Sequence, residues 1–141
     1  MNSSDPYNLN RFVEAQEPGY ERVVSELSGG RKQSHWMWFI FPQLRGLGYS
    51  EMAAYYGISS SKEARAYVEH PVLGPRLLEC TRLVNAVEGR TASDIFGFPD
   101  DLKFRSSMTL FAAAAPDEQV FQQALDKYFD SQGDSVTLQR L

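Results

Sequence analysis

Side chains able to bind or react with a ligand are densest between positions 94 and 107. This stretch contains three carboxylates, two cations and two hydroxyls: Asp94, Asp100, Asp101, Lys103, Arg105, Ser106 and Ser107. Cations beside hydroxyls offer charge-assisted hydrogen bonds to an anionic ligand, and a carboxylate can move a proton. The structural alternative is that Asp100 caps a helix and Asp101 pairs with Arg105 four residues later. Hydroxyls inside an otherwise apolar helix favour the ligand site, because they indicate a polar cavity or a close helix crossing.

Two further residues extend this candidate site to other parts of the chain. His35 enters a run of large apolar side chains, where loss of solvent would tune it for acid and base chemistry. The alternative is a core histidine hydrogen-bonded to a backbone carbonyl. Arg76 follows a Gly-Pro turn at a helix start, where a guanidinium and free backbone N–H groups bind anions, or it is a surface arginine. The candidate catalytic residues are His35 and Asp94, and the candidate ligand-binding residues are Trp36, Arg76, Asp100, Lys103, Arg105 and Ser106.

The run next to His35 has six large apolar side chains in a row, with the sequence Trp-Met-Trp-Phe-Ile-Phe at 36–41. It leaves no polar face under either a helical or a strand period, so we expect it to be enclosed on all sides. Its length suits a buried strand or a short helix, and periodicity does not separate the two. At about 25 cal/mol per Å² of apolar surface, its burial predicts the largest local contribution to stability.

Helical periodicity and helix boundary residues dominate the rest of the chain. Segment 20–27 has apolar residues at i, i+3, i+4 and i+7, and two glycines follow it. Similar signals predict a helix through 12–15 capped by Asn8 or Asn10, and helices at 51–56, 62–69 and 75–88. Two more helices are predicted, one before and one after Pro116, and a terminal helical turn is predicted to end at residue 138. His70, before Pro71, is expected to bind the last carbonyls of helix 62–69.

No segment shows sustained alternation of apolar and polar residues, which predicts an all-α protein. The short spacing between elements indicates an irregular multi-helix single domain around the buried aromatic segment, with residues 1–7 frayed. A chain of 141 residues has the usual length of one domain. Its 43% hydrophobic and 23% charged residues are typical of globular proteins.

Charge and cysteine content exclude several classes of function. A net charge of −4 disfavours nucleic-acid binding, which needs a basic face. The single cysteine, Cys80, forms no internal disulfide, which suits a cytoplasmic location. The two histidines are far apart in the sequence and there are no paired cysteines, so we expect no metal site. The sequence contains no nucleotide-loop or serine-hydrolase motif, and we expect no cofactor. No apolar stretch is long enough to cross a membrane. The sequence contains no signal that distinguishes a monomer from an oligomer.

Three segments, taken together and in order, resemble a known family. They are the core run at 34–43, SHWMWFIFPQ, then HPVLGPR at 70–76 and FPDDLKFRSSMTLF at 98–111. The chain is similar to the domain of unknown function 1810 family, small bacterial proteins sometimes mislabelled calpastatin. The resemblance runs from Arg11 to Leu138 and implies a mainly helical fold. Because this family has no established activity, the resemblance implies no catalytic residues. A second similarity, over 93–97 only, is to small helical N-glycosidases linked to ADP-ribose metabolism.

Two hypotheses from different classes therefore remain for the function. The first is a small enzyme or sensor for a nucleotide-like or other anionic small molecule, bound among the candidate residues beside the aromatic run. The second is a non-catalytic module whose exposed aromatic or acidic surface binds a protein partner. Polar groups that converge in one concave pocket would favour the first, and dispersed polar groups beside an exposed apolar patch would favour the second.

Overall fold

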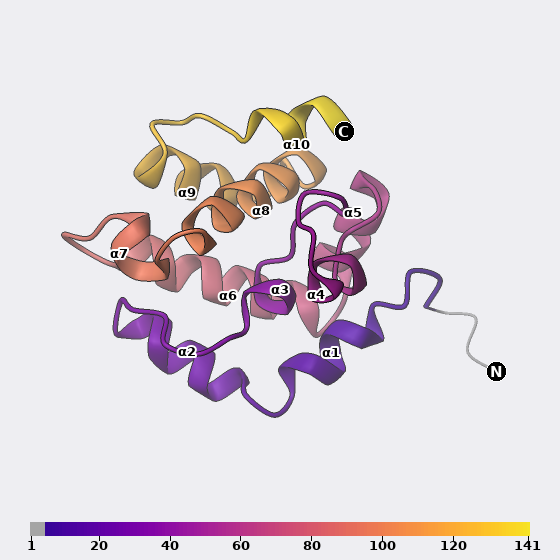
Figure 1. Ribbon diagram of the computed structural model, residues 1–141, viewed down its shortest axis with the longest axis horizontal. Coiled ribbons are helices and arrows are strands. Elements are labelled where there is room, and N and C mark those ends of the chain that lie inside the picture. The colour runs from indigo at the N-terminus through magenta and orange to yellow at the C-terminus, as the bar shows by residue number, and fades with distance from the viewer. Residues whose placement is uncertain (1–4) are drawn as a thin grey trace.

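The computed structural model describes residues 5–141, which form ten helices and no strand. The helices are α1 Asn10–Gln16, α2 Tyr20–Ser28, α3 Met37–Ile40, α4 Glu51–Tyr55, α5 Ser61–Glu69, α6 Leu73–Ala86, α7 Ala92–Phe96, α8 Asp100–Ala114, α9 Val120–Tyr128 and α10 Ser135–Arg140. The all-α prediction is confirmed. Along one edge of the molecule lie α1 and α2, while α8, α9 and α10 lie along the opposite edge and α6 runs between them (Figure 1). The helix α6 packs on α2, α5 and α9, and α8 packs on α5, α7, α9 and α10.

Helix α1 is capped by a residue that the sequence analysis assigned to a frayed end. The carboxylate of Asp5 accepts hydrogen bonds from the backbone N–H groups of Leu9, at 2.7 Å, and Asn10, at 3.0 Å. The prediction of a cap at Asn8 or Asn10 is therefore wrong. The prediction that residues 1–7 are frayed remains a prediction, and residues 1–4 lie outside the described part. Distant caps of this kind leave no three-residue signature in the sequence.

The aromatic run forms a single helical turn, α3, and not a strand. Phe41, at its end, is 1% exposed and meets the rings of Phe96 and Phe104 edge-on, at centroid distances of 5.9 and 4.9 Å. The prediction that the whole run is enclosed is wrong for Trp38 and Phe39, which are half-buried. A helical turn rotates successive side chains by about 100°, so one side of even an apolar turn faces outward.

Helices α5 and α6 meet at a sharp corner that depends on His70 and Gly74. The imidazole Nδ1 of His70 accepts from the N–H groups of Val72, at 3.1 Å, and Leu73, at 3.2 Å, so it caps the start of α6. The predicted bond to the carbonyls of the preceding helix is therefore wrong. A Cβ on Gly74 would lie 2.0 Å from the carbonyl oxygen of Val68, so only glycine permits this approach.

A buried ion pair joins α1 to α5. Arg11 Nη2 lies 2.9 Å from Glu63 Oε2, and the two side chains are 5% and 2% exposed. The remaining guanidinium donors bind the carbonyls of Tyr7, Asn8, Tyr55 and Gly57. The other carboxylate oxygen accepts from the N–H and hydroxyl of Ser59. One hydrogen-bonded network therefore links α1 to α5 and to the end of α4.

Within residues 5–141, the helices are too short or too polar to cross a membrane.

The Glu63→Ala substitution is expected to lower the free energy of unfolding by about 3–5 kcal/mol, because it leaves the Arg11 guanidinium buried without its counter-charge. Chemical denaturation of the variant and the parent measures this difference. Glu69→Ala is the matched control, because Glu69 pairs with Arg65 on the surface and exposed pairs contribute little. Equal losses in the two variants would contradict the central role of the buried pair.

Candidate functional site

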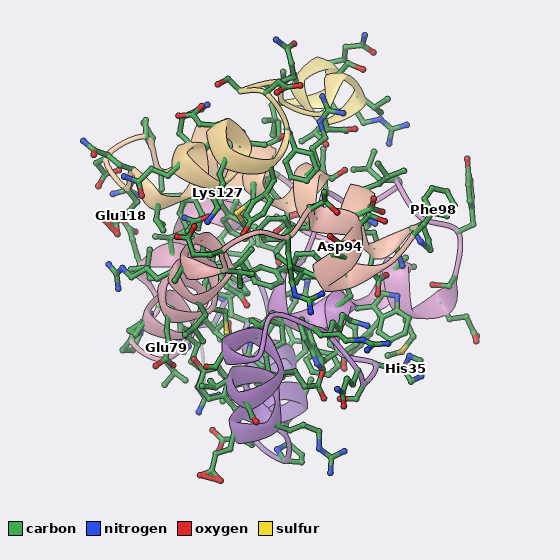
Figure 2. The ribbon with its side chains drawn as sticks, turned by 90° about the vertical axis from the view of Figure 1, so that its left-hand side faces the viewer. His35, Glu79, Asp94, Phe98, Glu118 and Lys127 are labelled. Atoms are coloured by element: carbon green, nitrogen blue, oxygen red, sulfur yellow. The ribbon has the colours of Figure 1, made fainter. Side chains whose placement is uncertain are left out.

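The predicted site residues do not all meet in one place. His35 and Asp94 lie well apart on the molecular surface in Figure 2, where Asp94 faces the viewer and His35 lies near the lower right edge. Arg76 lies on α6 against α1 and α2, whereas Asp100, Lys103, Arg105 and Ser106 lie on α8. The predicted residues thus divide into separate groups, and each group has its own local contacts.

Asp94 takes part in a capping box at the start of α7. Its carboxylate accepts from the backbone N–H of Thr91 at 3.0 Å, and the Thr91 hydroxyl accepts from the N–H of Asp94 at 3.0 Å. The Thr91 backbone N–H is the main group that lowers the pKa of the Asp94 carboxyl. An exposed and ionised capping carboxylate is a structural feature, and these contacts account for Asp94 without a ligand.

Arg76 is engaged by neighbouring side chains. Its Nη2 lies 3.0 Å from Glu17 Oε1, and its Nη1 donates to Gln16 Oε1 at 3.3 Å. The guanidinium also lies 4.8 Å from the centroid of the Tyr20 ring. These contacts hold α6 against the α1–α2 turn and pair the guanidinium with a carboxylate.

His35 and Trp36 line a surface groove of about 540 Å³ beside α2. The His35 side chain is exposed, so the expected loss of solvent does not occur. The groove also contains one carboxylate and one guanidinium, from Glu21 and Arg22, so it has no excess of positive charge. This balance makes the groove a weaker anion site than a surface with two cations.

Glu26 holds the entry to the aromatic run. Its Oε1 accepts from the N–H groups of Gln33, at 2.8 Å, and Ser34, at 3.1 Å, and from Trp36 Nε1, at 2.9 Å. Its Oε2 accepts from the Ser34 hydroxyl. Burial acts to raise the pKa of the Glu26 carboxyl, but the hydrogen bonds from Ser34, Gln33 and Trp36 outweigh it and lower the pKa to about 2. Trp36 is 3% exposed, and its only polar atom is used in this network.

Two lysines and Asp100 connect the aromatic run to the first turn of α8. Asp100 lies 2.9 Å from Lys32 Nζ and 3.7 Å from Lys103 Nζ. Each ammonium also faces an indole: Lys32 lies 5.3 Å from the Trp36 ring centroid, and Lys103 lies 5.4 Å from that of Trp38. Pro99 takes the N-cap position of α8, so the prediction that Asp100 caps this helix is wrong. The carboxylate instead orients two cations against two aromatic rings.

The remaining predicted residues of α8 have different surroundings. Arg105 Nε donates to the carbonyl of Gln132 at 2.9 Å, and its guanidinium lies 5.6 Å from the Phe129 ring centroid. It ties α8 to the chain after α9 and does not make the predicted pair with Asp101. Ser106 is 7% exposed, and its hydroxyl donates to the carbonyl of Leu102 at 3.2 Å. Its side chain lines the cleft described next.

A cleft of about 370 Å³ lies between the loop 43–49, the start of α8, and α10. We call it the α8–α10 cleft. Two cations line it, Lys103 from α8 and Arg140 from α10, together with one carboxylate, Asp134. One oxygen of that carboxylate already accepts from the N–H and hydroxyl of Thr137, at 2.9 and 2.7 Å. The cleft volume lies within the roughly 300–1,000 Å³ that is usual for small-molecule sites.

The backbone of the loop 43–49 comes close to Arg140. A Cβ on Gly46, whose φ is +94°, would lie 2.6 Å from Arg140 Nη1. Glycine therefore lets the guanidinium lie against the loop at one end of the cleft. Tyr49, from the same loop, also lines the cleft and is fully exposed, and Phe98 projects from the surface just before Pro99 (Figure 2).

Several residues of this cleft were missed by the sequence analysis: Gln43, Tyr49, Asp134 and Arg140, with Lys32 and Trp38 in the adjoining network. They come from segments that are far apart along the chain and show no common motif. The one available signal was the basic residue Lys32 close to the aromatic run. Cys80 lies elsewhere on α6, and burial raises the pKa of its thiol to about 12, so it is not a thiolate nucleophile at neutral pH.

The fold and the cleft define a small all-helical protein with two cations and an exposed aromatic ring around one surface cleft. Residues 6–141 match the model of the family described as Protein of unknown function (DUF1810). The chain belongs to this family, which confirms the resemblance found in the sequence.

A solved structure is similar to the chain over almost its whole length. It is the crystal structure of the conserved hypothetical protein Rv1873 from Mycobacterium tuberculosis, with 58% sequence identity and a TM-score of 0.96. The match covers 97% of this chain and 98% of that chain. No curated protein matches the chain. The comparisons therefore establish the family, the fold and a bacterial relative, and they name no activity.

The Glu26 network makes stability depend on pH in acid. Because the pKa of Glu26 is lowered in the folded state, its contribution is fully present above the ordinary value of 4.5 and is lost as pH falls toward 2. We expect the melting temperature of Glu26→Gln to fall less steeply than that of the parent between these two pH values. Thermal melts measure both slopes, with Glu69→Gln as the exposed control. Parallel slopes for parent and Glu26→Gln would show that the network does not lower this pKa.

Proposed function

We propose that the α8–α10 cleft binds a small anionic molecule that carries a planar ring, such as a nucleotide, and that the protein acts as a small enzyme or sensor for it. The observation that carries the proposal is the presence of two cations, Lys103 and Arg140, in one cleft with an exposed aromatic ring at its rim. A cytoplasmic location, favoured by the single free cysteine, is part of the proposal.

The charges of the cleft support binding of an anion. Among the described residues, Arg140 makes no ion pair, and the ion pair of Lys103 with Asp100 is long, at 3.7 Å. A guanidinium binds phosphate or carboxylate oxygens through two parallel hydrogen bonds, and an ammonium adds a compact charge. Together they favour a ligand with two or more negative oxygens. Asp134 offsets one of the two cations, which leaves the lining of the cleft with an excess of one positive charge.

Tyr49 supports the choice of a ligand with a ring. Its side chain is fully exposed at the mouth of the cleft, where it has no packing role within the described residues. An aromatic ring held at the edge of a polar cleft provides a flat surface on which a planar ligand stacks. The cations then bind the anionic end of the same molecule.

The protein-interaction module remains the second candidate, and one specific observation favours it. Four exposed apolar side chains lie on or beside the rim of the cleft: Tyr49, Phe98, Leu102 and Val136. Exposed apolar groups gathered in one place are typical of surfaces that bind proteins. The two cations inside the cleft favour the small-molecule hypothesis. A protein partner that binds through apolar side chains would not need these cations.

The proposal predicts that a nucleotide stabilises the protein through this cleft. We expect AMP, ADP, ADP-ribose or pyrophosphate, at 100 times its dissociation constant, to raise the free energy of unfolding by about 2.7 kcal/mol. Lys103→Ala and Arg140→Ala should each weaken binding by about 1.5–3 kcal/mol, because each removes a charge-assisted hydrogen bond. Thermal-shift titrations measure both effects.

The matched control is Lys62→Ala, because Lys62 is an exposed lysine on α5 away from the cleft. It should bind as the parent does. If no compound shifts the parent, or if the shifts are the same in Lys103→Ala, Arg140→Ala and the parent, the small-molecule function is contradicted. Loss of binding to a captured protein partner on Phe98→Ala would then favour the interaction module.

A further inference from the structure

The two indole N–H groups of the chain have different surroundings. Trp36 Nε1 donates to Glu26 at 2.9 Å. Trp38 Nε1 is fully buried, and among residues 5–141 no acceptor lies within hydrogen-bond distance of it. A buried donor without an acceptor is unfavourable, and such groups in folded proteins are usually completed by a water or a ligand. The protein therefore leaves one strong donor unused next to its cationic cleft.

A small cavity lies beside this indole. It is lined by Trp38, Gln43, Lys103 and Tyr56, among others, and the space open to the centre of a water molecule is about 10 Å³. That is room for one water-sized group. Gln43 and Lys103 also line the α8–α10 cleft, so these two side chains border both the cavity and the cleft.

The surroundings of the cavity select the chemistry of that atom. Trp38 and Lys103 both line the cavity, and Lys103 Nζ lies 5.4 Å from the Trp38 ring centroid, so a cation and an indole border the same small volume. The Gln43 side chain contributes an amide that can donate a further bond. Asp100 Oδ1 lies 3.7 Å from the same ammonium. Donors of this kind around a space for one atom favour an oxygen that carries negative charge.

We propose that this cavity is an oxyanion subsite at the inner end of the cleft, in which Trp38 Nε1 and Lys103 Nζ donate to one oxygen of the ligand. The oxygen belongs to a phosphoryl or a carboxylate group, and the volume excludes the whole group. The inference rests on the proposed function of the cleft and adds the atom that the ligand inserts. Arg140 at the far side of the cleft binds the remaining negative oxygens.

The test uses the fact that the chain has two tryptophans. A ¹H–¹⁵N NMR spectrum contains one indole cross-peak for each, and Trp38→Phe assigns them. We expect titration of the parent with AMP or pyrophosphate to move the Trp38 indole peak in a saturable way. The Trp36 peak should stay in place, because Glu26 holds that indole. Citrate in a parallel titration distinguishes a carboxylate oxygen from a phosphoryl oxygen.

A second measurement is the affinity of Trp38→Phe, which keeps an aromatic ring and removes the donor. Calorimetry should show at least a roughly tenfold weaker binding of the same probe, as expected for a lost bond to a charged oxygen. Lys62→Ala should bind as the parent does. If Trp38→Phe does not fold, triple-resonance spectra of the parent assign the two indole peaks, and the Trp38 peak still decides the question.

The outcomes separate this inference from the function on which it rests. If the probe stabilises the protein through Lys103 and Arg140 but the Trp38 peak does not move, the oxyanion subsite is overturned and the cleft function stands. The same holds if Trp38→Phe binds as tightly as the parent, since a water then occupies the cavity. If neither AMP, pyrophosphate nor citrate binds, both proposals are overturned.

Discussion

The Arg11–Glu63 ion pair is the contact on which the arrangement of the first half of the chain depends. Removal of two charges from water is strongly unfavourable unless all their hydrogen-bonding groups find partners. Here the guanidinium binds four carbonyls besides the carboxylate, and one of those carbonyls belongs to Gly57. The next residue, Ile58, exchanges backbone hydrogen bonds with Gln43 and Arg45. The buried pair thus fixes the base of the loop that forms one wall of the cleft.

The aromatic run has two roles that follow from its geometry as one turn of helix. Its inner side, with Trp36 and Phe41, packs into the core against Phe96 and Phe104. Its outer side presents Trp38 to Lys103 and to the small cavity. The Lys32–Asp100–Lys103 contacts link both sides to the first turn of α8. These contacts place the cationic wall of the cleft directly against the aromatic run.

The candidate polar residues fall into two groups, those with strong local partners and those with weak partners or none within residues 5–141. Asp94, Arg76 and Arg105 each have local partners that account for them: a cap, an ion pair and a backbone carbonyl. Lys103, Arg140 and the Trp38 indole have weak partners or none within residues 5–141, and all three lie at one cleft and its cavity. Polar groups left without strong partners near a concave surface are the usual mark of a binding site. The family and its mycobacterial relative share the fold on which this cleft is built.

The sequence alone determined the helical class, because glycines and helical periods act over a few residues, and three of its motifs identified the family. It also located the polar residues of α8, two of which line the cleft. Only the tertiary structure showed which of them have local partners within residues 5–141. The cap at Asp5, the partners of Arg11 and Asp100, and the meeting of Gln43, Lys103 and Arg140 join segments that are distant in sequence. Such contacts depend on how the helices cross, and no local pattern records that geometry.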